Sequence, residues 1–325
     1  MELLILAHAP TRILEQGLLP AAAELQLKVT ILTDCVREHI VRAQASSLYG
    51  QCELAECDVF NPLAVARFVS IHGRQFNGLL AADAVLHASA AVSAASLGLP
   101  GAAWRNAVLH DQRCDFKVGL GRSSSHYRRI ADCADCAEPA TDPGVDWFPA
   151  TVQSLESSAM TGGTIVRNTA ELQRGLAELR HGYALLEKYR EDEEVYALDA
   201  LATPDGLMIL SGSRIEFDQN PARTKRVHSF MPRPPRCDEL LSLLPPQYLG
   251  LGRHHVEYAV SAAGVRIREI HNGLHDDESE LALDDQLDGK LFSEVLKASL
   301  GMPVKPLHLL HIDAAPPAVA MRVTA

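Results

Sequence analysis

Short apolar runs alternate with longer segments of helical periodicity through the first hundred residues, and this alternation restricts the fold more than any other feature. The runs Leu3 to Ala7, Lys28 to Leu32 and Gly78 to Ala82 predict buried strands. Apolar residues recur at helical spacing in Thr11 to Leu27, and the Ala-rich segment Ala84 to Leu97 predicts a second helix. Strands that alternate with helices in this way predict a parallel, doubly wound α/β sheet.

The turn after the first strand lacks the glycines of a dinucleotide site. Ala7-His8-Ala9-Pro10 stands where a GxGxxG pattern would bring the backbone against a pyrophosphate. A nicotinamide-dependent enzyme that uses this sheet is therefore a weaker alternative.

Composition and charge exclude several classes of partner. The chain has 325 residues, of which 47% are hydrophobic, enough for a large core divided into subdomains. Its net charge is −11 and it has no run rich in Lys or Arg, so we expect no nucleic-acid partner. No apolar stretch reaches the roughly 18–20 residues of a membrane span, and the apolar start, Met1 to Ala7, is too short for a signal peptide. We therefore expect a cytoplasmic protein that does not bind membranes, and a homodimer is compatible with the sequence.

The cysteines do not predict a scaffold. Their number is seven, which is odd, and the chain is long, so a disulfide framework is not expected. Cys133 and Cys136 form a CxxC pair, but a structural zinc site needs two more ligands at similar spacing. We interpret this pair as two thiols in the polar region 123–144, which we expect to be a loop.

The middle of the chain predicts a small α+β unit. A helix is expected over Asn106 to Leu120. Strands over Asp146 to Gln153 and Thr164 to Arg167 flank a loop rich in Ser, Thr and Gly, and predict a hairpin. A helix over Thr169 to Arg180, with its first residue as N-cap, then precedes a strand over Tyr183 to Tyr189.

Two antiparallel hairpins are predicted in the C-terminal half. The first surrounds the turn Thr203-Pro204-Asp205-Gly206. The second pairs Val256 to Ser261 with Val265 to Ile270 around Ala262-Ala263-Gly264. A helix is expected to follow over Lys290 to Leu300.

The second hairpin carries candidate metal ligands. Glu257 lies near the middle of one strand and Glu269 at the end of its partner, and strand alternation around a turn at 262–264 lets both carboxylates point into one cavity. His271 follows on the same face. Two carboxylates and a third polar ligand suit Mg²⁺, whose coordination ATP phosphates would complete. The alternative is three ordinary polar residues on a solvated sheet face.

The other polar clusters favour simpler interpretations. We expect His254-His255 at the surface or behind the metal ligands, and the acidic residues from Asp276 to Glu280 in a solvated loop. The basic cluster Arg223 to Arg226 either meets an anionic substrate or, as we favour, is solvated. His271 and His275 have a metal-ligand spacing, but the glycine between them argues against a shared helix.

The order of these segments resembles the ATP-grasp family over nearly the whole chain. Leu97-Gly98-Leu99-Pro100-Gly101, followed by Asn106 and Asp111, resembles the start of its nucleotide-binding part. Trp147 to Gln153 resembles the apolar strand that leads to a phosphate-binding lysine. Ser157 to Gly163 resembles the Gly/Ser loop that closes over the phosphates, where glycines let backbone amides approach closely.

The C-terminal half continues the resemblance. Leu185 to Tyr189 resembles the hinge strand whose backbone holds adenine, and Glu194 resembles the acid that binds ribose. Val256-Glu257-Tyr258 and Arg268-Glu269-Ile270-His271 resemble the two metal-binding strands.

The resemblance implies a fold, cofactors and a set of site residues. The fold would be α/β ATP-grasp, with a Rossmann-like subdomain over 1–105 and two α+β nucleotide-binding subdomains over 106–182 and 183–325. The cofactors would be ATP and Mg²⁺, with Glu257, Glu269 and His271 as metal ligands. The residues around the nucleotide would be Gln112, Gln153, Ser158, Thr161, Gly162, Gly163, Glu187, Lys188, Tyr189 and Glu194.

Four positions depart from the family's pattern. Gln112 and Gln153 stand where the family has lysine, His271 stands where it has the metal-binding asparagine, and Gly273 stands where it has the catalytic arginine. Glutamine can donate a hydrogen bond to a phosphate but brings no charge, and charge-assisted contacts are roughly twice as strong. Other basic residues could compensate, namely Arg113, Lys117, Arg266 and Arg268.

Two functions are therefore expected. The first is an ATP- and Mg²⁺-dependent ligase that joins a small-molecule carboxylate to an amine through an acyl phosphate, in the biosynthesis of a metabolite or a peptide-like product. The second is a degenerate ATP-grasp protein without ligase activity that serves as a binding or partner subunit. The sequence does not identify the substrates.

Overall fold

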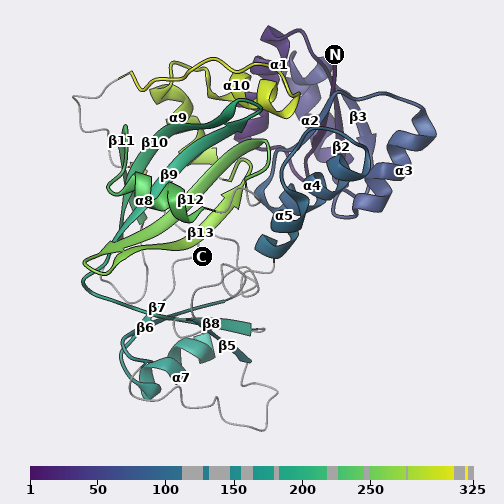
Figure 1. Ribbon diagram of the computed structural model, residues 1–325. Helices are drawn as coiled ribbons and strands as arrows, with labels where there is room; N and C mark the ends of the chain where they lie inside the picture. The colour runs from purple at the N-terminus through teal and green to yellow at the C-terminus, as the bar shows by residue number, and fades with distance from the viewer. Residues whose placement is uncertain are drawn as a thin grey trace.

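The computed structural model of the chain describes residues 1–111, 127–131, 147–154, 164–178, 183–217, 226–244, 249–275, 277–310 and 319–320. Within these ranges the strands form a parallel sheet, a small antiparallel sheet and a larger antiparallel sheet (Figure 1). None of the described helices is long and apolar enough to cross a membrane.

The N-terminal sheet confirms the predicted parallel α/β arrangement. Its strand order is β3-β2-β1-β4, and each neighbouring pair is parallel. The apolar run of β1 is buried on both faces, because Leu3 and Ile5 enter one core cluster while Leu4 and Leu6 enter another. The strands are β1 (Glu2–Leu6), β2 (Lys28–Thr33), β3 (Glu53–Glu56) and β4 (Gly78–Ala81).

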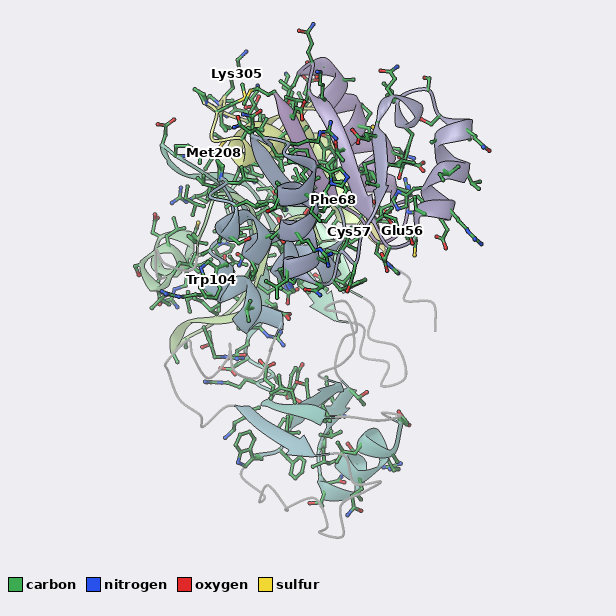
Figure 2. The ribbon with its side chains drawn as sticks, turned by 90° about the vertical axis from the view of Figure 1, so that its right-hand side faces the viewer. Glu56, Cys57, Phe68, Trp104, Met208 and Lys305 are labelled. Atoms are coloured by element: carbon green, nitrogen blue, oxygen red, sulfur yellow. The ribbon has the colours of Figure 1, made fainter. Side chains whose placement is uncertain are left out.

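The helix predicted over residues 11–27 is divided into a π-helical turn and a short α-helix. Pro20 lies in the first turn of the α-helix, where its missing N–H group is tolerated. The helical elements of this part are η1 (Ile13–Leu18), α1 (Leu19–Glu24), α2 (Val36–Ala45), η2 (Tyr49–Gln51), α3 (Pro62–His72), η3 (Ala84–Leu86), α4 (His87–Ser96) and α5 (Trp104–Asp111). Figure 2 shows Trp104 at the start of α5 and Glu56-Cys57 at the carboxyl end of β3. The rest of the helix expected over 106–120 lies outside the described residues.

The C-terminal helices pack against the N-terminal sheet, so the two ends of the described chain share one core (Figure 1). α10 (Leu291–Ser299) confirms the helix predicted over 290–300. Its Phe292 ring lies against Gly17 of η1, where a Cβ atom would come within 2.5 Å of the ring. Glycine at position 17 is therefore required by the close approach of this aromatic side chain.

The small antiparallel sheet has the strand order β5-β8-β6-β7 and carries α7. Its core consists of apolar side chains from the strands and from α7, such as Val152, Leu172 and Leu186. β6 and β7 pair antiparallel, as expected for the predicted hairpin. The elements are β5 (Tyr127–Ala131), β6 (Ala150–Ser154), β7 (Thr164–Val166), α7 (Thr169–Glu178) and β8 (Tyr183–Lys188).

Three expectations for this region need correction. β5 lies within the segment 123–144 that was expected to be a loop, because it pairs with β8. β8 pairs with both β5 and β6, so the small sheet continues to Lys188 instead of ending at residue 182. Asn168, not Thr169, caps α7, because its side-chain oxygen accepts a hydrogen bond from the Glu171 amide at 2.9 Å.

The large sheet has the strand order β13-β12-β9-β10-β11-β14, and all of its neighbouring pairs are antiparallel. Both predicted hairpins are confirmed as β9–β10 and β12–β13. The strands are β9 (Glu194–Thr203), β10 (Gly206–Phe217), β11 (Arg226–Met231), β12 (Gly252–Ser261), β13 (Gly264–Asn272) and β14 (Val319–Ala320). Arg226, the last residue of the basic cluster, begins β11, and the other three lie outside the described residues.

One face of the large sheet is apolar and packs on α8 (Cys237–Leu243) through residues such as Leu198, Leu240 and Val256. One end of the opposite face packs on α9 and α10. The acidic run expected to be a solvated loop instead enters helix α9 (Asp277–Gln286). The Asp277 carboxylate accepts hydrogen bonds from the amides of Arg12 and Ile13, and Glu280 is fully buried.

Candidate functional site

A polar patch lies on the face of the large sheet opposite α8. Cross-strand partners share a face, so the register of β9, β12 and β13 places Asp199, His255, Glu257, Glu269 and His271 on this one side. All five side chains are buried. Buried polar groups need partners, so this patch is not the solvated sheet face that the sequence left as the alternative, and we take it as the candidate site.

A β-bulge at Arg268 creates this arrangement. Ser261 pairs with Gly264, so the turn contains only Ala262 and Ala263 and not the three residues expected. Counting from that turn, a regular ladder would place Arg268 opposite Glu257. The register shifts between Glu257 and Tyr258, and Glu269 pairs with Glu257 instead. Glu257 and Glu269 therefore lie opposite each other, as expected, although the turn is one residue shorter than expected.

Glu257, Glu269 and His271 offer ligand atoms that all lie within 4.8 Å of one another. The His271 Nε2 atom is 3.5 Å from the Glu269 carboxylate. Burial lowers the pKa of His271, so the imidazole is neutral near pH 7 and can offer a lone pair to a cation. The two carboxylates fit Mg²⁺, with water and phosphate oxygens completing its shell, while the imidazole nitrogen also suits transition metals.

A buried ion network supports these ligands from behind. Asp199 accepts hydrogen bonds from Arg253 at 2.6 Å and from the His255 Nδ1 atom at 2.8 Å. Arg253 also donates to Glu280 at 3.1 Å, and Glu280 lies 2.9 Å from the His275 Nδ1 atom. The rings of His255 and His275 stack with their centroids 4.5 Å apart. The network thus fixes two histidines beside the acidic pair.

The network also sets the charges in the patch. Burial raises the pKa of Asp199, but the charges of Arg253 and His255 lower it well below its ordinary value, so this carboxyl is ionised. Burial lowers the pKa of His255, but Asp199 outweighs this effect and raises it to about 10. His255 is therefore a cation at neutral pH, with its Nε2 atom 3.9 Å from the Glu257 carboxylate.

His87, from the start of α4, meets the large sheet at Gly273. Gly273 has a φ of +93°, and a Cβ atom there would lie 2.4 Å from the His87 ring. The His87 Nε2 atom is buried and has no hydrogen-bond partner among the described residues. Burial lowers the pKa of His87 to about 4, so its ring is neutral. No side chain can extend from position 273 unless His87 moves.

Arg266 and Arg268 reach from β13 to the end of β8. Arg266 donates to Glu187 at 2.9 Å and to Glu193 at 2.7 Å, and the Arg268 Nε atom is 3.4 Å from the Glu187 carboxylate. Glu187 and Glu193 are both buried or nearly so. These contacts join β13 of the large sheet to β8 of the small sheet. They also pair both arginines with carboxylates.

Comparison of the sequence with known families and curated proteins finds no match. No model of a known protein family matches it, and no curated protein matches it by sequence.

Solved structures, by contrast, match it over most of its length. One is an N5-carboxyaminoimidazole synthetase from Staphylococcus aureus complexed with ADP, with a TM-score of 0.69, 13% identity, and coverage of 95% of this chain and 80% of that one. Another is an L-amino acid ligase from Bacillus licheniformis, with a TM-score of 0.65, 14% identity, and coverage of 94% and 75%. A third is a carboxyaminoimidazole ribonucleotide synthase from Aspergillus clavatus complexed with ATP, with a TM-score of 0.67, 15% identity, and coverage of 93% and 78%.

The chain has the ATP-grasp fold. Its parallel N-terminal sheet, small antiparallel sheet and large antiparallel sheet correspond to the three-part architecture that the resemblance implied. The fold by itself does not fix the reaction, which must be argued from the site.

The ATP-grasp residues expected around the nucleotide are only partly brought together. Lys188 ends β8, and the Tyr189 amide donates to the Pro149 carbonyl at 2.9 Å. Glu194 pairs with Val260 and so points to the α8 face, where it accepts hydrogen bonds from Tyr196 and Arg214. Gln153 lies in β6, and the remaining expected positions, Gln112, Ser158, Thr161, Gly162 and Gly163, lie outside the described residues.

The structure reveals site residues that the sequence argument missed. Glu193 lies on the same side of the sheet as Glu257 and Glu269, where Arg266 donates to it, whereas Glu194 faces α8. Of the two positions expected for His255, the structure shows the one behind Glu257 and not the one at the surface, and the period-2 spacing that linked Glu269 to His271 also favours it. Asp199 and Arg253 carried no local signal, because their partners lie on other strands or on α9.

The raised pKa of His255 predicts a pH dependence of stability. A folded-state pKa of about 10 against an unfolded value near 6.5 means that the stabilisation is fully present below about pH 6.5 and is lost as pH rises through 10. We expect the free energy of unfolding of the wild type, relative to a His255→Gln variant, to fall between pH 7 and 10 by at most about 1.4 kcal/mol per pH unit. Urea denaturation at a series of pH values measures this difference. A constant difference across that range would show that His255 is neutral in the folded protein.

Proposed function

We propose that the chain is an ATP- and Mg²⁺-dependent ligase that joins a small-molecule carboxylate to an amine through an acyl phosphate. The observation that carries the proposal is the buried cross-strand pair Glu257 and Glu269 with His271 beside it, on one face of the large sheet of an ATP-grasp fold. Structures similar to this chain are of ligases and synthetases, and two of them hold ADP or ATP.

The residues of the patch have distinct roles in this proposal. Glu257, Glu269 and His271 would hold the cation, which supplies charge neutralisation at the phosphates. His255, fixed as a cation by Asp199, places a positive charge 3.9 Å from Glu257 and so adds to the positive potential of a site that lacks two expected lysines. Glu187, Lys188 and Tyr189 would line the adenine pocket, with Arg266 holding Glu187 in place.

Calorimetric titration with ATP, with and without Mg²⁺, tests the proposal. We expect Mg²⁺-dependent binding that Glu269→Ala weakens by about 10- to 100-fold, because a charged contact contributes about 1.5–3 kcal/mol. Glu216→Ala is the matched control, since Glu216 is an exposed carboxylate of the same sheet. ADP release in a screen of carboxylates and amines would then establish ligase activity. Equal binding by wild type and Glu269→Ala would contradict the assignment of the acidic pair.

A second function is favoured by one observation. The position of the catalytic arginine is a glycine whose Cα faces the His87 ring, and Arg266 and Arg268 are already paired with carboxylates. We therefore also propose, as the alternative, an ATP-grasp protein that binds nucleotide or a protein partner without catalysing ligation. ATP binding without ADP release in the presence of every carboxylate and amine pair tested would support this alternative over the ligase.

A further inference from the structure

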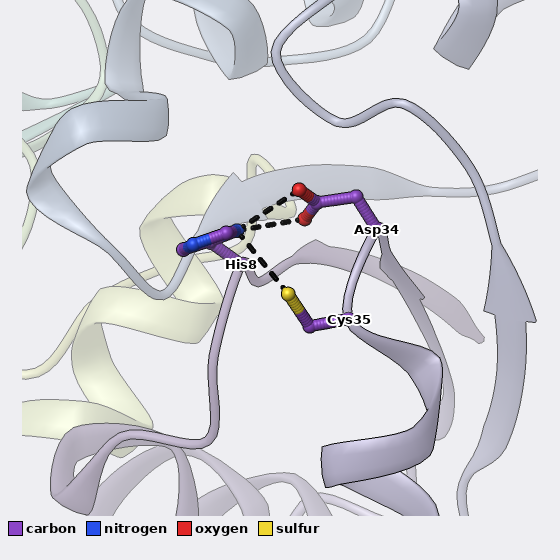
Figure 3. A group of neighbouring side chains, drawn as sticks. All are labelled: His8, Asp34 and Cys35. Atoms are coloured by element: carbon purple, nitrogen blue, oxygen red, sulfur yellow. Dashed lines mark hydrogen bonds and ion pairs between the residues drawn. The ribbon is translucent and has the colours of Figure 1, made fainter.

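Three potential metal ligands meet at the carboxyl ends of β1 and β2 (Figure 3), in a group separate from that of Glu257, Glu269 and His271. His8 follows β1, and Asp34 and Cys35 lie between β2 and α2. The ligand atoms of these three residues lie within 4.8 Å of one another. In a doubly wound sheet, this edge is where ligands bind. The group is partly exposed, so an ion can reach it from solvent.

The three side chains converge on a single atom. The His8 Nδ1 atom lies 2.9 Å and 3.0 Å from the two Asp34 carboxylate oxygens and 3.7 Å from the Cys35 sulfur (Figure 3). In a nucleophilic Cys-His-Asp triad, the thiol and the carboxylate contact opposite nitrogens of the ring. Here both contact the same nitrogen, so the group is not arranged as a catalytic triad.

The distances instead suit a tetrahedral metal ion. For ordinary zinc bond lengths, a tetrahedral angle separates a nitrogen and a sulfur ligand by about 3.6 Å, and a nitrogen and an oxygen ligand by about 3.3 Å. The observed separations of 3.7 Å and 2.9–3.0 Å require shifts of only a few tenths of an ångström. Imidazole, thiolate and carboxylate are also the three ligand types that zinc uses in proteins.

The backbone of His8 is held on both sides. Its amide donates to the Asp83 carboxylate at 2.6 Å, and its carbonyl accepts from the buried Thr33 hydroxyl at 3.0 Å and from the His39 ring at 3.2 Å. Tyr49 in turn donates to the other nitrogen of His39 at 2.5 Å. The Thr33 hydroxyl also accepts from the Cys35 amide at 3.0 Å, so a single buried side chain fixes two of the three candidate ligands. Such support behind the ligands is typical of metal sites.

The surroundings are electrically negative. Asp83 lies on one side of His8, and Asp34 and Glu38 lie near the Cys35 thiol. Among the ion pairs within the described ranges, none brings a lysine or an arginine to Asp34 or Asp83. A cation at this edge would relieve the repulsion among these groups.

We propose that His8, Asp34 and Cys35 bind a divalent transition-metal ion of the zinc type through Nδ1, a carboxylate oxygen and Sγ. Three protein ligands leave one tetrahedral position for water or for a substrate group with an oxygen or nitrogen lone pair. The ion is distinct from the one assigned to Glu257 and Glu269, where the ligand set contains no sulfur.

Binding requires the thiolate and so releases a proton. A metal ion binds cysteine as the thiolate, so the thiol proton must leave when the site is loaded. When the metal–sulfur bond forms, the S–H bond breaks and the proton passes to solvent. The affinity for the metal is therefore expected to rise with pH by up to about tenfold per pH unit over the range in which the free thiol remains protonated.

Titration of the full-length protein with Co²⁺, followed by absorption, tests the site. A cobalt–thiolate bond gives a near-ultraviolet charge-transfer band, whereas cobalt on carboxylates and imidazoles does not. We expect a band that saturates at one equivalent and is displaced by Zn²⁺. The Glu269→Ala variant should retain the band, because Glu269 belongs to the acidic pair and not to this site. The cobalt result therefore does not depend on whether the protein is a ligase.

Cysteine variants provide the decisive comparison. Cys35→Ser should abolish the band, while Cys57→Ser, at the end of β3, and the Cys133→Ser/Cys136→Ser double variant should keep it. Thr33→Val should weaken Co²⁺ binding by about 10- to 100-fold, because it removes the group that orients two ligands. Circular dichroism confirms that each variant is folded. A band that persists in folded Cys35→Ser, or the lack of any thiolate band at millimolar Co²⁺ and pH 8, overturns the proposal.

Discussion

Replacement of Arg253 with alanine is expected to destabilise the protein by about 3–5 kcal/mol, since this guanidinium neutralises two buried carboxylates at once. The side chain is 1% exposed and pairs with Asp199 at 2.6 Å and with Glu280 at 3.1 Å. Without Arg253, Asp199 and Glu280 would be buried charges that lack their main partner. Burial raises the pKa of Glu280, and the Arg253 charge is what holds it below its ordinary value.

The midpoint and slope of urea denaturation measure this effect. Arg214→Ala is the matched control, because Arg214 lies in the same sheet and pairs with Glu194, but both side chains are about half exposed. An exposed pair contributes about 0–1 kcal/mol, so the control should unfold nearly as the wild type does. Equal stabilities of the two variants would show that the buried network contributes no more than a surface pair.

Gly273→Arg, which introduces the arginine that the ATP-grasp resemblance implies at this position, is expected to destabilise the protein by about 2–5 kcal/mol instead of increasing activity, since two independent costs combine. The φ of +93° at Gly273 is strained for any residue with a side chain. The new Cβ atom would also lie 2.4 Å from the ring of His87, the first residue of α4.

Gly206→Arg separates the two costs. Gly206 has a φ of +133°, and a Cβ atom added there would meet nothing within 4 Å, so this position shares the backbone strain but not the contact. We expect Gly273→Arg to be more destabilising than Gly206→Arg by about 1–3 kcal/mol. The double variant Gly273→Arg/His87→Ala should recover that difference. If the chain is a ligase, the double variant should also release ADP faster than the wild type; no recovery of stability would contradict the role of His87.

The sequence was sufficient for the elements whose burial is uniform along the strand. β1 is covered on both faces, so its continuous apolar run, Leu3 to Leu6, identifies it without knowledge of the tertiary structure. β5 is not recognisable in this way, because its sequence, Tyr127-Arg128-Arg129-Ile130-Ala131, has little alternation, and pairing with β8 defines it. α9 is equally hard to recognise, because acidic residues fill its first turn, where they are favourable to a helix but also typical of a solvated loop.

In the candidate site, too, some features follow from the sequence and others only from the tertiary structure. The sequence by itself determined the chemical types and the order of the candidate ligands: two carboxylates and an imidazole on a hairpin, within segments whose order resembles that of ATP-grasp proteins. Only the tertiary structure decided that Glu257 faces Glu269, because the bulge at Arg268 compensates for a shorter turn than expected. It also decided the charges of the patch and the contact between His87 and Gly273, because both depend on residues from strands and helices that are distant in the sequence. Local patterns specify which face a residue prefers, whereas register, pKa and close contacts arise only when separate elements pack together.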